Sequence, residues 1–230
     1  MENVNVKIGE RVIPISVRRP HNAKRISLRI SQAKNSVVLT LPKRASLLSG
    51  MKFLDSKSDW LLTNLEENPA ITIYDGATLP ILGKLYTIKR LNGRGVTQLD
   101  TENLQIVVHC QEEFITRRVK DFLKKFLQEE CTKRAEHLAF ALNKHIKKVI
   151  ISEAMSRWGS CKKDGTLSFS SLLIFAPPEI LQYIIAHEVA HLKEMNHSPH
   201  FWKVVEQLYP DMHCARKWLR KEGYRLHRYP

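Results

Sequence analysis

The sequence predicts an α+β protein, with a mainly β N-terminal part that contains one inserted helix and a mainly helical C-terminal part. Apolar residues alternate with polar ones over roughly the first 110 residues, which is typical of strands. From Glu112 onward they recur at three- and four-residue spacing, which is typical of amphipathic helices. No Gly/Ser-rich linker separates the two parts. We therefore expect a β subdomain over residues 1–111 and a second subdomain over residues 112–230 that packs against it.

The predicted strands carry apolar side chains at every second position, as strands with one buried face do. The clearest alternating runs are Ile13, Ile15 and Val17, then Ile26, Leu28 and Ile30, then Val37, Leu39 and Leu41. The turn signals Asp75-Gly76 and Asn92-Gly93 bracket further strand, which ends in Leu104, Ile106 and Val108. We expect these strands to form an antiparallel sheet.

Helical spacing marks one helix inside the β region and one long helix after it. The inserted helix is predicted behind the N-cap residue Ser46 by Leu47, Met51, Leu54, Leu61 and Leu65. The long amphipathic helix is predicted by Ile115, Val119, Phe122, Phe126, Leu127, Cys131, Leu138 and Leu142.

The chain is strongly basic and shows no sign of a membrane span. Its 37 Lys and Arg residues against 23 Asp and Glu residues give a formal net charge of +14 and a pI near 9.7. Such a charge makes contact with a polyanion easy, and we expect weak DNA binding with little sequence preference; a basic surface that only faces solvent is the competing interpretation. No apolar run approaches the roughly 20 residues that span a bilayer, and the N-terminus shows no export signal. We expect a cytoplasmic protein without membrane contact.

The cysteines lie far apart and form no CxxC pair. They are Cys110, Cys131, Cys161 and Cys214. This distribution argues against both a disulfide framework and a zinc ribbon. Any metal ligands are therefore expected among the histidines.

The strongest functional signal is His187-Glu188-Val189-Ala190-His191, an HExxH motif inside an apolar segment with helical periodicity. Pro177 and Pro178 stand at the entrance of this predicted helix. Residues four apart share one face of a helix, so both imidazoles can reach one Zn²⁺ while Glu188 lies beside the water on the metal. The motif predicts a zinc site of the hydrolytic type.

A catalytic zinc ion usually has three protein ligands, so one more is needed. His197 is the leading candidate. The helix is expected to continue through Glu194 and Met195, with Asn196 in the left-handed conformation that ends helices and returns His197 to the metal. The predicted metal ligands are therefore His187, His191 and His197.

The residues that follow His197 leave some roles open. Ser198 and Pro199 resemble the N-cap and the first turn of another helix. For His200 three roles remain, namely an alternative third ligand, a residue that orients a ligand and an exposed helix residue. The spacing also matches that of metzincins, but Glu194 stands where their pattern has Gly, which disfavours that class.

The expected reaction is hydrolysis of a peptide bond in a protein or peptide substrate, with Glu188 as the general base that takes a proton from the zinc-bound water. Arg157, Tyr183 and His200 are candidates for the electrophilic partner, although a structural ion pair for Arg157 and core packing for Tyr183 compete with that role. Two alternatives are a basic nucleic-acid-binding protein with a structural zinc site and an inactive scaffold. Structural zinc normally has four protein ligands, and no nearby cysteine completes such a set.

Further segments around the motif carry a family resemblance. They include Arg157-Trp158-Gly159-Ser160-Cys161 upstream, the run from Asn196 to Trp202 downstream, the segment from Phe53-Leu54 to Trp60-Leu61, the stretch from Ala176 to Glu179, and Trp218-Leu219. Together with HExxH they resemble the YgjP-like metallopeptidase family over most of the chain. Ser170 departs from the family, which usually carries Asn on the strand before the HExxH helix.

The resemblance implies a mainly β N-terminal part, a minimal zincin-like C-terminal part and zinc bound by His187, His191 and His197. It also implies a relationship to the SprT-like proteases, some of which act on DNA-bound proteins. That relationship suggests nucleic-acid-associated proteins as a substrate class.

Overall fold

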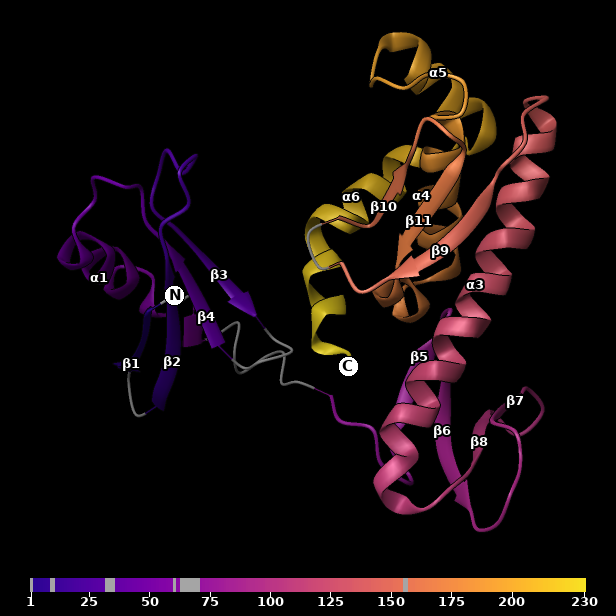
Figure 1. Cartoon of the computed structure of the whole chain (residues 1–230), viewed down its shortest axis with the longest axis horizontal. Coiled ribbons are helices and arrows are strands. Elements are labelled where there is room, and N and C mark those ends of the chain that lie inside the picture. Colours follow the sequence, from indigo (N-terminus) through magenta and orange to yellow (C-terminus); the bar gives the residue numbers. More distant parts are fainter. Residues whose placement is uncertain (1, 9–10, 32–35, 60, 63–70, 155–156) are drawn as a thin grey trace. The chain divides into compact units, whose positions relative to one another are not determined.

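The computed structural model describes residues 2–8, 11–31, 36–59, 61–62, 71–154 and 157–230. Their contacts divide the chain into two compact units (Figure 1). Unit 1 comprises Met1–Ile71 and His227–Pro230, and unit 2 comprises Thr72–Leu226. The division expected at 111/112 differs from this one, because the strand that ends at His109 packs against the long helix that follows it. The predicted α+β class is confirmed.

Unit 1 is built on a four-stranded sheet with the order β1-β2-β4-β3. Its elements are β1 (Glu2–Ile8), β2 (Arg11–Arg18), β3 (Ser27–Ser31), β4 (Ser36–Thr40) and α1 (Leu47–Asp55). The expectation of a purely antiparallel sheet is wrong, since β2 runs parallel to β4. The cause is that the connection from β2 to β3 passes β4, which therefore lies between them.

The core of unit 1 comes from the alternating runs and from α1. The apolar residues of the first and third runs are all buried, whereas those of the second run, which lie in β3 and just before it, are only partly buried. α1 begins behind Ser46, whose side chain accepts a hydrogen bond from Ser49 N, as predicted. The helix ends at Asp55, and Leu61 beyond it is buried in the same core. Leu65 lies outside the described residues.

Unit 2 begins with a second four-stranded sheet, in the order β5-β6-β8-β7. Its strands are β5 (Thr78–Ile81), β6 (Lys84–Leu91), β7 (Gln98–Asp100) and β8 (Gln105–His109). The two predicted turn glycines, Gly76 and Gly93, have φ values of +91° and +95°, which L side chains rarely adopt. Ile106 and Val108 are buried as predicted, while Leu104 precedes the strand.

The long predicted helix is present as α3 (Ile115–Ala141), after the short 3₁₀ helix η2 (Glu112–Phe114). Its buried face comprises Ile115, Val119, Leu123, Leu127, Cys131, Ala135, Leu138 and Ala139. Phe122 and Phe126 are only half-buried and stack on each other at the edge of this face. α3 packs against β8 and against the elements that follow it, so it links the two sheets of unit 2.

A three-stranded sheet and several helices complete unit 2. The strands are β9 (Lys148–Ser152), β10 (Gly159–Cys161) and β11 (Thr166–Ser170), and their order in the sheet is β10-β11-β9. The α-helices are α4 (Pro178–Ala190), α5 (Pro199–Leu208) and α6 (Met212–Glu222). Two 3₁₀ helices, η3 (Ser171–Phe175) and η4 (Gly223–Arg228), lie before α4 and after α6. α4 packs against α3, α5, α6 and the edge strand β10. In the part of the chain that is described, no helix combines the length and apolar character that a membrane span requires.

Candidate metal centre

Helix α4 positions the first two histidines, since it carries His187 in its last turn and has His191 as its C-cap. Pro178 occupies its first turn, where the missing N–H of proline costs no hydrogen bond. Most residues of α4 are buried, so packing on several sides holds the helix in place. His187 is half-buried in the last turn of α4. His191, the first residue after the helix, is buried. Their rings lie 5.2 Å apart between centroids, as the four-residue spacing predicts.

A tight turn after α4 returns the chain toward these two rings. The helix ends at Ala190, so the expected continuation through Glu194 and Met195 is wrong. Hydrogen bonds from Lys193 N and Glu194 N to Ala190 O close the turn. Asn196 does not have positive φ, because this turn already reverses the chain before that residue is reached.

The next helix fixes the position of His197. Ser198 is the N-cap of α5, and its Oγ accepts a hydrogen bond from Phe201 N at 3.2 Å. Pro199 is the first helical residue, so both expectations for this helix start are confirmed. His197 therefore lies between two anchored points, the turn after α4 and the cap of α5.

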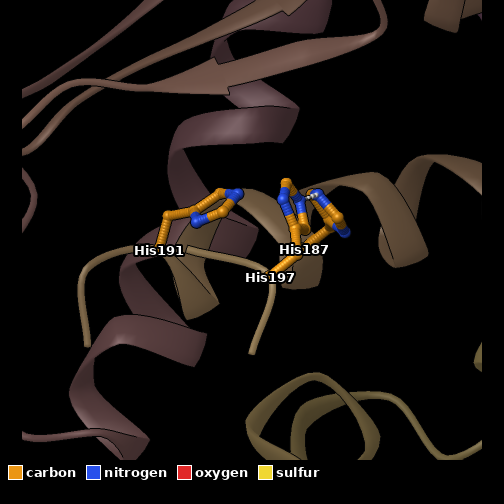
Figure 2. A group of neighbouring side chains, drawn as sticks. All are labelled: His187, His191 and His197. Carbon is orange, nitrogen blue, oxygen red and sulfur yellow. Dashed lines mark hydrogen bonds between the residues drawn. The ribbon is translucent and has the colours of Figure 1, made fainter. Parts of the chain in front are cut away.

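Figure 2 shows the three imidazoles turned toward one another. Nε2 of His197 lies 3.1 Å from Nε2 of His187, and one nitrogen from each of the three rings can be chosen so that all lie within 4.8 Å of one another. A tetrahedral zinc ion with bonds of about 2.0–2.1 Å separates its nitrogen ligands by about 3.3 Å. The His187–His197 pair already has about this separation, and a nitrogen of His191 completes the group. The donor set therefore fits one small cation.

Two of the three histidines, His187 and His191, are held in the form that binds metals. Burial lowers the pKa of His187 to about 4, and the positive charges of protonated His191 and His197 act in the same direction. Burial also lowers the pKa of His191. With its proton on Nδ1, His191 donates a hydrogen bond to Glu194 O at 3.0 Å, which leaves Nε2 free for a cation. Neutral imidazoles with a free lone pair are good metal ligands.

An aromatic wall supports the cluster from α5. The ring of Phe201, which is fully buried, stacks on His191 at 4.4 Å and meets His187 edge-on at 4.9 Å. The Trp202 ring lies 5.7 Å from that of His197, and the guanidinium of Arg216 sits 4.3 Å above Trp202. In the sequence, Phe201 and Trp202 stood out only as part of the run from Asn196 to Trp202 that carries the family resemblance. The sequence carried no signal for Arg216, because a cation from α6 reaches Trp202 only through the packing of helices.

Glu188 is almost fully buried, with 5% of its surface exposed. A Cβ atom placed on Gly159 of β10 would lie 2.5 Å from Oε1 of Glu188, so the carboxyl group rests directly on the backbone of the edge strand. Burial raises the pKa of Glu188 to about 8, and the positive charge of Arg157 opposes this rise. Arg157 itself is exposed. The contact with Gly159 was not expected from the sequence, since it depends on how β10 crosses α4.

The other residues singled out by the sequence fall around this cluster or outside it. Tyr183 is buried, with its ring 6.1 Å from those of His187 and Tyr209, which favours the core-packing interpretation. His200 is exposed on α5 and is not part of the three-histidine group. Burial raises the pKa of Cys161 to about 11, which disfavours a thiolate there. Ser170 ends β11, where its Oγ donates to Ala154 O and accepts from Leu172 N.

Two histidines four residues apart at the end of a helix, a third histidine from the following turn and a buried glutamate between the first two define a metallopeptidase-type site. The comparison with known families agrees. A model of the YgjP-like family, metallopeptidase domain, matches residues 24–222, and the chain belongs to this family. No curated protein and no solved structure compared with the chain matches it significantly.

Proposed function

We propose that the protein is a zinc-dependent peptidase that binds zinc through His187, His191 and His197 and uses Glu188 as its general base. The observation that carries this proposal is the close grouping of the three imidazoles, next to a buried carboxyl group, in a chain of a metallopeptidase family. Three histidine ligands leave one position of a tetrahedral ion open, as catalytic zinc sites do.

Each of these residues has a task that follows from its position. Zinc, when bound, polarises the carbonyl of the scissile bond and lowers the pKa of water to about 7. Glu188 accepts a proton from the attacking water at its carboxylate and delivers it to the leaving amine. The backbone at Gly159 limits where the Glu188 carboxylate can lie, and Phe201 excludes water from one side of the histidines.

Metal removal and replacement test this proposal. The purified protein is dialysed against a chelator, divided, and supplied with zinc, magnesium or no metal before an unstructured protein such as casein is added. Cleavage that disappears on dialysis and returns with zinc supports a zinc peptidase. Cleavage that survives complete removal of metal, or zinc-loaded protein that cleaves neither casein nor short peptides, overturns it. The second result, with one zinc ion retained, would favour the alternative of a structural zinc site in a nucleic-acid-binding protein.

We also propose proteins associated with nucleic acid as a substrate class. The formal net charge of +14 supports this proposal, because it favours contact with a polyanion. Cleavage of a DNA-binding protein should then be faster with its DNA present than without it. Equal rates with and without DNA would remove this substrate class and leave the peptidase proposal untouched.

A further inference from the structure

One long segment of unit 1 has basic residues without any acidic ones. Between Arg11 and Leu54 the sequence contains no Asp or Glu. Its basic residues are Arg11, Arg18, Arg19, Lys24, Arg25, Arg29, Lys34, Lys43, Arg44 and Lys52. An ordinary solvated surface mixes both signs of charge, so a segment of this length with one sign only is unusual.

The topology of the sheet gathers much of this charge at one end. β2 and β4 run parallel with Arg18 opposite Thr40, so the segments that follow the two strands leave the sheet at the same end. β3 is antiparallel to β4 with Ser27 opposite Thr40, so β3 begins at this end as well. The β2–β3 connection must therefore cross the end of β4, beside the chain that leads from β4 to α1.

Hydrogen bonds join these two connections. Nη1 of Arg19 donates to Ala45 O at 2.6 Å and to Pro42 O at 3.4 Å, and Leu41 N donates to Arg18 O at 2.9 Å. Six exposed basic residues thus lie on adjoining segments: Arg18, Arg19, Lys24, Arg25, Lys43 and Arg44. We call them the basic end of unit 1. The acidic residue that the strand register places nearest is Glu2, opposite Val17 on β1, which lies on the side of β2 away from β4.

We propose that the basic end of unit 1 binds the phosphate backbone of a nucleic-acid duplex, independently of the peptidase site in unit 2. Six cations without a neighbouring anion on their own connections complement a dense row of phosphates. Phe53 is the only aromatic residue between Arg11 and Leu54, so the segment offers no row of rings on which unpaired bases could stack. This favours a duplex over a single strand.

The same residues disfavour a membrane surface. Peripheral membrane binding combines cations with apolar side chains that enter the interface. Among the described residues, neither connection carries an exposed large apolar side chain; the nearest in sequence, Leu48, belongs to α1. Nor does the basic end have the ordered donor pairs on a helix or ribbon that read base edges, so binding without sequence preference is expected.

The test measures binding of a short labelled DNA duplex to the full-length chain by fluorescence anisotropy over a range of salt concentrations. The test variant changes Lys24, Arg25, Lys43 and Arg44 to Gln, and leaves Arg19 in place because it holds the two connections together. The matched control removes the same charge from unit 2, by changing the exposed Lys120, Lys133, Lys144 and Lys163 to Gln. Circular dichroism of all three proteins verifies folding.

The unit 1 variant should bind at least about 10-fold more weakly at low salt. The slope of its log binding constant against log salt concentration should become less steep by about one for each lost phosphate contact. The control variant should stay within about twofold of the parent chain at low salt. Equal weakening of both variants, absence of binding by the parent chain, or binding to phosphatidylserine vesicles but not to the duplex would each overturn the proposal. Because the assay uses no hydrolysis, its outcome does not depend on whether the chain is a peptidase.

Discussion

Gly159 and Glu188 are in such close contact that no side chain fits between them. A Cβ atom at Gly159 would come within 2.5 Å of Oε1 and 2.6 Å of Cγ of Glu188. Both distances are shorter than Cβ atoms tolerate, so any larger residue displaces the carboxyl group. The edge strand β10 therefore sets the position of the carboxylate that we propose as the base.

The variant Gly159→Ala should lose most peptidase activity while it keeps its zinc. A displacement of about 1 Å in a reacting group can cost about 10²-fold in rate, and the loss should fall on kcat more than on KM. Zinc content should stay at the parent level, because the three atoms nearest to a Cβ at Gly159 all belong to Glu188, which is not a predicted metal ligand. Ser160→Ala, one residue along the same strand, is the matched control and should stay near parent activity. Parent-level kcat in Gly159→Ala would mean that Glu188 tolerates displacement or is not the base.

His197→Ala should lose most of the bound zinc, whereas His200→Ala should retain it. The Nε2 atom of His197 lies 3.1 Å from that of His187, while His200 is exposed and outside the cluster. Zinc per protein chain after dialysis, measured by mass spectrometry of the metal, distinguishes the two variants. The reverse pattern would show that α5 turns in the zinc-bound protein and that His200 is the third ligand.

The cap of α5 should matter for metal affinity as well as for stability. Ser198→Ala removes the side-chain acceptor for Phe201 N, which typically costs about 1 kcal/mol of stability. Because His197 directly precedes this cap, we expect weaker zinc binding in competition with a chelator. Ser46→Ala removes the equivalent cap of α1 in unit 1 and is the control. Its zinc affinity should equal that of the parent chain, and an equal loss in both variants would exclude a local effect at His197.

Much of the fold follows from local sequence patterns, but the pairing of the strands does not. The alternation of Ile13, Ile15 and Val17 predicted a strand with one buried face, and the spacing of Ile115 and Val119 predicted α3. Alternation fixes which side chains face the core and carries no information about the neighbouring strand. The parallel pairing of β2 with β4 therefore could not be predicted in this way.

In the candidate site, too, the features that depend on local sequence could be predicted and those that depend on contacts between distant segments could not. The grouping of His187 with His191 follows from helical spacing alone, and the cap at Ser198 follows from its side chain. The end of α4 at Ala190 was missed, because residues 191–195 contain no Gly or Pro to mark a stop. The contact between Gly159 and Glu188 joins two distant segments, so it has no local sequence signal.

The variant Glu188→Gln should leave folding and zinc content nearly unchanged but remove hydrolysis. The amide has the same shape as the carboxyl group, so it fits the buried space against Gly159. It cannot accept a proton from water, and loss of a general base typically costs about 10²- to 10⁴-fold in rate. The three histidines should hold zinc without Glu188, so the midpoint of thermal unfolding and the zinc stoichiometry should match those of the parent chain.

Three measurements on the same preparation make this prediction sharp. Zinc content and thermal unfolding are determined first, and the hydrolysis rate is then measured with and without additional zinc. Added zinc should not restore the rate, because the variant lacks the proton acceptor and not the metal. Glu188→Asp keeps a carboxylate on a shorter side chain and should recover part of the activity if proton transfer is the missing step. A zinc-loaded Glu188→Gln protein that cleaves at the parent rate would show that another group takes the proton.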